Sequence, residues 1–113
     1  MITIYHNPRC RKSREALEIL KDRNKNLDII LYLQEPLNEN QLKQIVSMLE
    51  IEPEQLVRKN EVEWKDNFKG KDISQKDILK AITKYPKLME RPVVVNGKKA
   101  VIARPPERVL EII

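Results

Sequence analysis

The N-terminal stretch Ile2-Thr3-Ile4-Tyr5-His6-Asn7-Pro8-Arg9-Cys10 predicts a strand, a turn and the start of a helix. Its first four residues alternate between isoleucine and another residue, which is the two-residue period of a strand. Asn7-Pro8 marks a turn, and apolar residues then recur at helical spacing from Cys10 to Asp22. A nearly continuous apolar run over 28–33 suits a second strand, buried on both faces. This order predicts a βαβ unit with parallel strands.

The last quarter of the chain predicts a hairpin and a helix. Residues 92–95 and 98–103 have strand character, and Asn96-Gly97 between them is the strongest short hairpin signal. Pro105 and Pro106 then open a final helix, because proline suits the first helical position.

Helices are predicted between these two halves. Asn38 with Gln41, and Ser74 with Asp77, have capping-box spacing ahead of apolar helical patterns. Pro53 begins another short helix. The sequence therefore predicts an α/β protein with a thioredoxin-like βαβ-ββα core. We expect one domain over 1–113, with a helical insertion at about 36–88.

Composition excludes several classes of protein. The chain has 113 residues, a net charge of +5, one Cys and one His. A single Cys forms no intramolecular disulfide, and one Cys with one His argues against a closed zinc site, so no metal is expected. Because no apolar run approaches about 20 residues and the N-terminus lacks the pattern of a targeting peptide, we expect a cytoplasmic protein without membrane contact. The scattered aromatic residues argue against a nucleic-acid partner.

Cys10 is the candidate nucleophile. It lies at a predicted helix N-terminus, where unpaired N–H groups favour the thiolate and bind oxyanions. Four basic residues adjoin it in sequence: Arg9, Arg11, Lys12 and Arg14. The alternative is a buried, inert thiol, but the polar, basic surroundings favour reactivity. Since Ser13 stands where a dithiol enzyme has its second Cys, the resolving thiol must come from another molecule.

Several separated motifs carry a resemblance to a known family. They are Tyr5-His6-Asn7-Pro8-Arg9-Cys10 with Ser13-Arg14, Leu31-Tyr32-Leu33, Leu56-Val57-Arg58-Lys59-Asn60, Arg91-Pro92-Val93-Val94-Val95 and Arg104-Pro105. In this order the chain resembles the glutaredoxin-linked arsenate reductases. That thioredoxin-fold branch also contains bacterial regulators that act through RNA polymerase.

The resemblance implies a mechanism. Cys10 would be the nucleophile, and Arg58, Arg91 and Arg104 would hold arsenate, since guanidinium groups bind oxyanions through paired hydrogen bonds. Arg91 precedes Pro92, where a thioredoxin-like fold has its cis-proline. Glutathione would be a co-substrate that attacks the sulfur–arsenic adduct, glutaredoxin would resolve the mixed disulfide, and no bound cofactor is implied.

Further residues would support Cys10. His6 matches a family histidine that hydrogen-bonds the thiolate or tunes its pKa, although an ordinary loop histidine is an equal alternative. Asn7 either orients the loop or simply forms its turn. Ser13 is a hydrogen-bond donor in the first helical turn or a solvated residue, and Arg14 adds positive charge.

Two other functions stay open. A redox-responsive regulator that binds RNA polymerase would fit the same branch, but it usually carries the second Cys that Ser13 replaces. A general glutathione-dependent thiol reductase would use Cys10 on a substrate other than arsenate.

Overall fold

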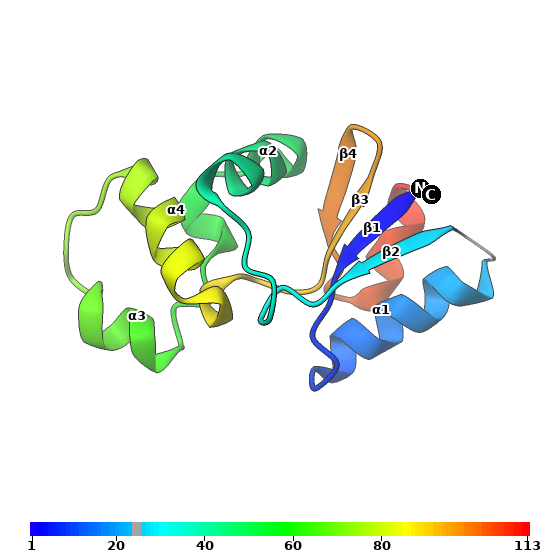
Figure 1. Ribbon diagram of the computed structural model, residues 1–113, viewed down its shortest axis with the longest axis horizontal. Coiled ribbons are helices and arrows are strands. Elements are labelled where there is room, and N and C mark those ends of the chain that lie inside the picture. Colours follow the sequence, from blue (N-terminus) through cyan, green and yellow to red (C-terminus); the bar gives the residue numbers. More distant parts are fainter. Residues whose placement is uncertain (24–25) are drawn as a thin grey trace. The chain divides into compact units, whose positions relative to one another are not determined.

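The computed structural model describes residues 1–23 and 26–113. Within it the chain forms two compact units. The first contains residues 1–35 and 91–113, and the second contains residues 36–90. In Figure 1 the labelled strands and α1 belong to the first unit, and α2, α3 and α4 belong to the second.

A four-stranded sheet forms the centre of the first unit. Its strands are β1 (Ile2–Tyr5), β2 (Leu27–Ile30), β3 (Val93–Asn96) and β4 (Lys99–Ile102). In the order β2-β1-β3-β4, β1 is parallel to β2, and the other two pairs are antiparallel. The predicted βαβ unit and hairpin are therefore confirmed. Gly97, with φ of +63°, lies in the tight turn between β3 and β4, a conformation that glycine adopts without strain.

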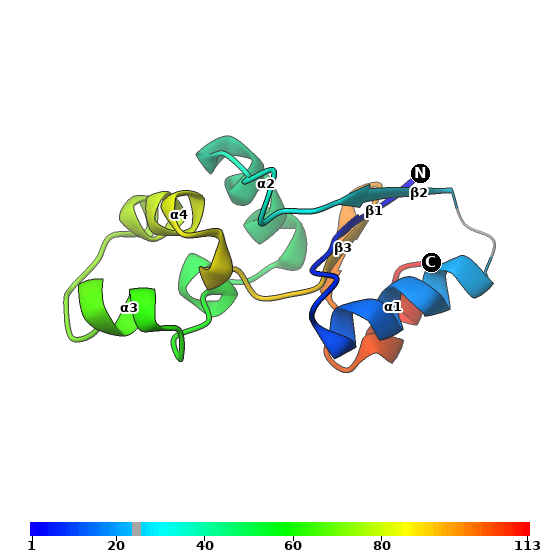
Figure 2. The same cartoon turned by 60° about the horizontal axis from the view of Figure 1, so that its bottom comes forward.

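One face of this sheet is covered by α1 (Arg11–Asp22) and by the 3₁₀ helix η3 (Pro106–Glu111), as Figures 1 and 2 both show. Buried apolar side chains from the strands and helices form one cluster there: Ile2, Ile4, Ala16, Leu20, Val94, Val101, Ala103 and Val109. Removing this apolar surface from water is the main force that holds α1 against the sheet. The start of α1, where Cys10 lies, is thereby anchored to a rigid core.

The second strand differs from its prediction. We expected a strand over 28–33 buried on both faces, but β2 ends at Ile30 and lies at an edge of the sheet. The side chain of Ile29 is 41% exposed. After Ile30 the chain turns, and the N–H groups of Gln34 and Glu35 both donate to the Leu31 carbonyl. The apolar run was therefore a poor indicator of burial, because β2 has a neighbouring strand on one side only and part of it stays accessible to solvent.

The second unit is helical. It contains α2 (Glu39–Leu49), η1 (Pro53–Leu56), α3 (Val62–Asn67), α4 (Gln75–Lys84) and η2 (Pro86–Leu88). The capping box of Asn38 and Gln41 is confirmed. The one predicted at Ser74 is wrong in part, because Ser74 accepts from the Asp77 N–H but the reciprocal bond does not form. The helix α3 was not predicted, since six residues are too few to show a helical period.

No helix of the part described is long and apolar enough to cross a membrane.

Candidate active site

Cys10 is the N-cap residue of α1. The loop before it is held by Asn7, which makes three hydrogen bonds. The Asn7 carbonyl accepts from the Cys10 N–H at 3.0 Å, and its Oδ1 accepts from the Arg9 N–H at 3.0 Å. Its own N–H donates to Ser13 Oγ at 3.0 Å. This arrangement fixes where the sulfur enters the first turn of the helix.

The environment of Cys10 favours the thiolate. Partial burial raises the pKa of the Cys10 thiol, but the Ser13 N–H, the Arg91 guanidinium and the Lys12 N–H together lower it further than burial raises it. The net result is a pKa below the ordinary value of a cysteine thiol. A lowered pKa increases the fraction of the nucleophilic form at neutral pH. Two of these three causes belong to the helix N-terminus, as the sequence predicts.

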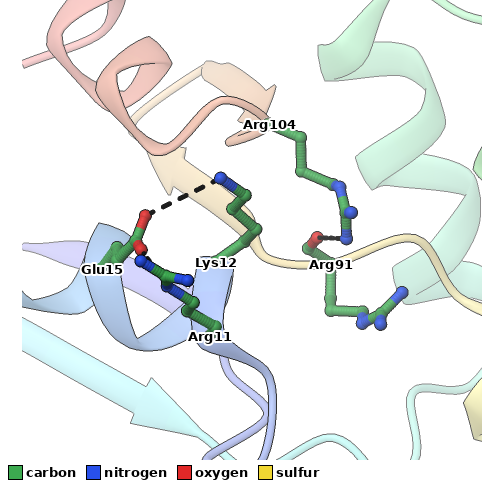
Figure 3. Close-up of polar contacts among 5 residues, drawn as sticks. All are labelled: Arg11, Lys12, Glu15, Arg91 and Arg104. Carbon is green, nitrogen blue, oxygen red and sulfur yellow. Dashed lines mark hydrogen bonds and ion pairs between the residues drawn. The ribbon is translucent and has the colours of Figure 1, made fainter.

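Arg91 places a positive charge near the Cys10 thiol, although the two residues are far apart in the sequence. It immediately precedes β3, and its peptide bond to Pro92 is cis, as the resemblance implies. The Arg91 Nε atom is buried and has no hydrogen-bond partner among the described residues. Arg104 lies beside it, with Nη1 of Arg104 at 3.5 Å from the Arg91 carbonyl (Figure 3). The Arg91 guanidinium thus acts on Cys10 and the Arg91 carbonyl accepts from Arg104, so all three residues lie in the first unit.

Three of the four basic residues adjacent to Cys10 in sequence have other partners. Arg11 Nε lies 2.9 Å from Glu15, and Lys12 Nζ lies 4.0 Å from the same carboxylate (Figure 3). Arg14 donates to the Pro8 carbonyl at 2.9 Å. The cation that lowers the pKa of Cys10 is instead Arg91. Proximity in sequence is therefore a poor guide here, because side chains four apart on a helix pair with each other.

His6 contacts Ser13. The His6 side chain is buried, and its Nδ1 lies 2.6 Å from Ser13 Oγ. Burial lowers the pKa of His6, and the nearby charges of Lys21 and Arg14 lower it further, which favours the neutral ring. His6 is therefore connected to Cys10 indirectly. It contacts the Ser13 side chain, and the Ser13 N–H lowers the pKa of the Cys10 thiol.

Arg58 lies in the helical unit, between η1 and α3. Its Nη1 lies 2.6 Å from Glu61, and its Nε lies 3.8 Å from Glu90. These two acidic partners were not predicted, because each lies in a stretch of sequence that contains charges of both signs. For Glu61 the signal would have been its position three residues after Arg58, whereas Glu90 is distant in sequence.

The charge of the chain is concentrated in the unit that contains Cys10. That unit has 12 lysines and arginines against 7 aspartates and glutamates, whereas residues 36–90 have 10 of each. The unit that contains Cys10 therefore accounts for the whole net charge of +5. No group of three or more His, Cys, Asp or Glu side chains is placed to hold a metal ion within residues 1–23 and 26–113. A nucleophilic thiol beside a basic site suits chemistry on an oxyanion.

Comparison with known proteins identifies the family of the chain. The model of the ArsC family matches residues 5–112. The chain belongs to the ArsC family. It is 44% identical to an arsenate reductase of Haemophilus influenzae, over 99% of this chain and 98% of the relative. It is 34% identical to an arsenate reductase of Escherichia coli, over 99% of this chain and 80% of the relative.

Solved structures support the ArsC fold. An arsenate reductase from Vibrio cholerae superposes with a TM-score of 0.95 at 37% identity, over 99% of this chain and 97% of that one. The expected thioredoxin-like α/β fold is thereby confirmed. The sequence resemblance to the arsenate reductases is confirmed as well.

The lowered pKa of Cys10 in this ArsC-family protein predicts a pH profile. Alkylation by iodoacetamide is expected to rise with pH and to reach half its maximum below the midpoint of a free cysteine, because only the thiolate reacts. The rate is measured by mass spectrometry between pH 5 and about 10. Urea-unfolded protein is the control, since unfolding removes the helix N-terminus and Arg91. Equal midpoints in the two states would show that the fold does not activate the thiol.

Proposed function

We propose that this ArsC-family protein reduces arsenate to arsenite, with glutathione and glutaredoxin as the external thiols. The observation that carries the proposal is the lowered pKa of Cys10 beside Arg91, whose buried Nε has no partner among the described residues. A buried guanidinium N–H without an acceptor is costly, and an oxyanion would satisfy it. The arsenate reductases among its relatives support the choice of oxyanion.

The first step joins sulfur to arsenic. The Cys10 thiolate attacks the arsenic atom, a sulfur–arsenic bond forms, and one oxygen of arsenate leaves as water after taking up protons. Arg91 and Arg104 would hold the remaining oxygens, and Arg58 would be the third ligand. Fixed cations stabilise the charge on these oxygens without having to reorganise.

The second step reduces arsenic. Glutathione attacks the sulfur of the adduct, and the electron pair of the sulfur–arsenic bond passes to arsenic, which leaves as arsenite. Cys10 and glutathione are then joined in a mixed disulfide. A thiol of glutaredoxin attacks the glutathione sulfur and returns Cys10 to its thiolate, because the chain has no second Cys to do so. Overall, two external thiols are oxidised to a disulfide while arsenic(V) becomes arsenic(III).

The test is arsenite formation by the purified protein. With arsenate, glutathione, glutaredoxin and an NADPH-dependent system that regenerates glutathione, we expect NADPH oxidation and arsenite in equal amounts. Omission of glutathione or glutaredoxin should stop turnover, since each supplies a thiol that the chain lacks. Turnover of glutathione mixed disulfides without any arsenite would instead support a general thiol reductase. Absence of both activities, with capture of RNA polymerase, would favour a regulator.

A further inference from the structure

Ser13 is buried in the first turn of α1 and has contacts on two sides. Its side chain has no exposed surface. Its backbone N–H is one of the groups that lower the pKa of the Cys10 thiol. Its hydroxyl oxygen lies 3.0 Å from the Asn7 nitrogen and 2.6 Å from His6 Nδ1. One residue therefore connects the thiol with the loop that precedes it.

The two contacts of the Ser13 hydroxyl determine where the hydrogen atoms lie. A serine hydroxyl has one hydrogen to donate and two lone pairs that accept. Because the Asn7 N–H can only donate, Ser13 Oγ accepts in that bond. Within residues 1–23 and 26–113, the acceptor placed for the hydroxyl hydrogen is then Nδ1 of His6. If Nδ1 carried a hydrogen of its own, the buried hydroxyl hydrogen would lose this partner, which is costly.

The surroundings of His6 favour the neutral ring. Its side chain is 5% exposed, and burial disfavours the charged form. Lys21 and Arg14 lower the pKa of His6 further, and both line an open cavity together with His6. Glu18 and Asp22 line the same cavity, yet the pKa of His6 stays below its ordinary value. A neutral ring whose Nδ1 accepts a hydrogen bond carries its own hydrogen on Nε2.

The Ser13 hydroxyl links the loop to the helix in a place that water does not reach. Two of the three hydrogen bonds of Asn7 stay within the loop, and the third goes to Ser13 on α1. Another side-chain bond from α1 to the loop, from Arg14 to the Pro8 carbonyl, is exposed and therefore competes with water. The buried hydroxyl is thus the link that best resists displacement of the loop.

We propose that Ser13 is a positioning residue for the nucleophile. Its hydroxyl donates to Nδ1 of a neutral His6 and accepts from the Asn7 N–H, which keeps the loop in place against α1. With the loop in place, the N–H groups of the first helical turn stay directed at Cys10. His6 then acts as a hydrogen-bond acceptor, without a charge and without a contact to sulfur. The inference rests on the proposed function only for its kinetic test.

The tautomer of His6 tests the hydrogen-bond pattern directly. The chain has one His, so protein made with ¹⁵N-histidine gives the signals of His6 alone. At pH 7 we expect Nδ1 to have the nitrogen chemical shift of an unprotonated acceptor and Nε2 that of a protonated nitrogen. In Ser13→Ala the preference for one tautomer should weaken, because Nδ1 has lost its donor. A hydrogen on Nδ1 of the wild type at pH 7 would overturn the inference.

Substitutions of His6 and Ser13 separate an acceptor from a charge. The amide oxygen of Asn can accept where Nδ1 does, whereas Leu cannot. We expect His6→Asn to keep the pH midpoint of Cys10 alkylation. His6→Leu and Ser13→Ala should raise it by about half a unit, roughly a three-fold loss of thiolate below the midpoint. Since Ser13→Ala keeps the backbone N–H, its shift reports the position of the loop.

The control for these variants is Ser47→Ala, because Ser47 is an exposed serine on another helix, α2. It should leave the midpoint unchanged. A variant that is merely less stable contains less folded protein, but the midpoint of the folded fraction does not move. Equal midpoints for His6→Asn and His6→Leu, or an unchanged midpoint for Ser13→Ala, would overturn the inference.

These measurements need no arsenate, so the inference and the proposed function can fail separately. In the complete assay, kcat/KM for arsenate should fall about three-fold in His6→Leu and Ser13→Ala and be retained in His6→Asn. The expected tautomer and midpoints without any arsenite would refute only the proposed function. Arsenite formation with the other tautomer, or with His6→Asn as impaired as His6→Leu, would refute only the inference.

Discussion

Cys10→Ser is expected to abolish arsenite formation, with a loss on the order of a thousand-fold or more. A serine hydroxyl ionises far above the pH range in which a thiolate forms, so the N–H groups of Ser13 and Lys12 and the charge of Arg91 have no anion to stabilise. Oxygen also cannot pass through the mixed disulfide that the second step requires. The measurement is arsenite formed per minute in the complete assay with glutathione and glutaredoxin.

The control for this variant is its stability. Cys10 is only half-buried at the start of α1, and serine is a preferred N-cap residue, so the midpoint of thermal unfolding should stay the same or rise slightly. Binding of arsenate, followed by calorimetry, should also persist because the arginines remain. Residual activity of more than a few per cent of wild type would mean that Cys10 is not the nucleophile.

Arg91→Ala is expected to lower kcat/KM for arsenate by about a hundred- to a thousand-fold. Arg91 contributes twice, because it lowers the pKa of Cys10 and presents a buried Nε with no partner among the described residues. Its loss should therefore weaken arsenate binding and move the alkylation midpoint of Cys10 to higher pH. Steady-state kinetics and the iodoacetamide profile measure the two effects separately.

Two further variants sharpen this prediction. Arg91→Lys should restore much of the shift in the alkylation profile, because it restores the charge, but little of kcat/KM, because an ammonium lacks the two-pronged geometry. Arg23→Ala is the matched control, since Arg23 is an exposed arginine at the other end of α1. If Arg91→Ala changes neither the profile nor kcat/KM, Arg91 has no part in the site.

The site was predicted from the sequence where its interactions are local. The turn at Asn7-Pro8 and the helical period after it place Cys10 at a helix N-terminus, and the structure confirms that position. The hairpin at Gly97 and the cap at Asn38 are confirmed for the same reason. Turns and caps are specified within three or four residues, so their signals can be read without knowing the fold.

Other features depended on the tertiary structure. The four basic residues near Cys10 in sequence suggested the source of its activation, but Arg11 and Lys12 pair with Glu15, and Arg14 contacts a backbone carbonyl. The exposure of Ile29 also escaped prediction, because an apolar run does not show whether a strand lies at the centre or the edge of a sheet. Glu90, one of the two acidic partners of Arg58, could be found only after its segment was seen to pair with that of Arg58.

By itself, the sequence determined the order of elements in the unit that contains the sheet, the place of the thiol at the start of α1 and the absence of a second Cys that could resolve it. These follow from short-range patterns and from counting. Only the tertiary structure decided which cation activates Cys10. The pairing of β1 with β3 brings the segment that begins at Arg91 to the segment that leads to Cys10. The pKa of the thiol therefore depends on a charge from a distant part of the sequence, because electrostatic interactions follow distance in space.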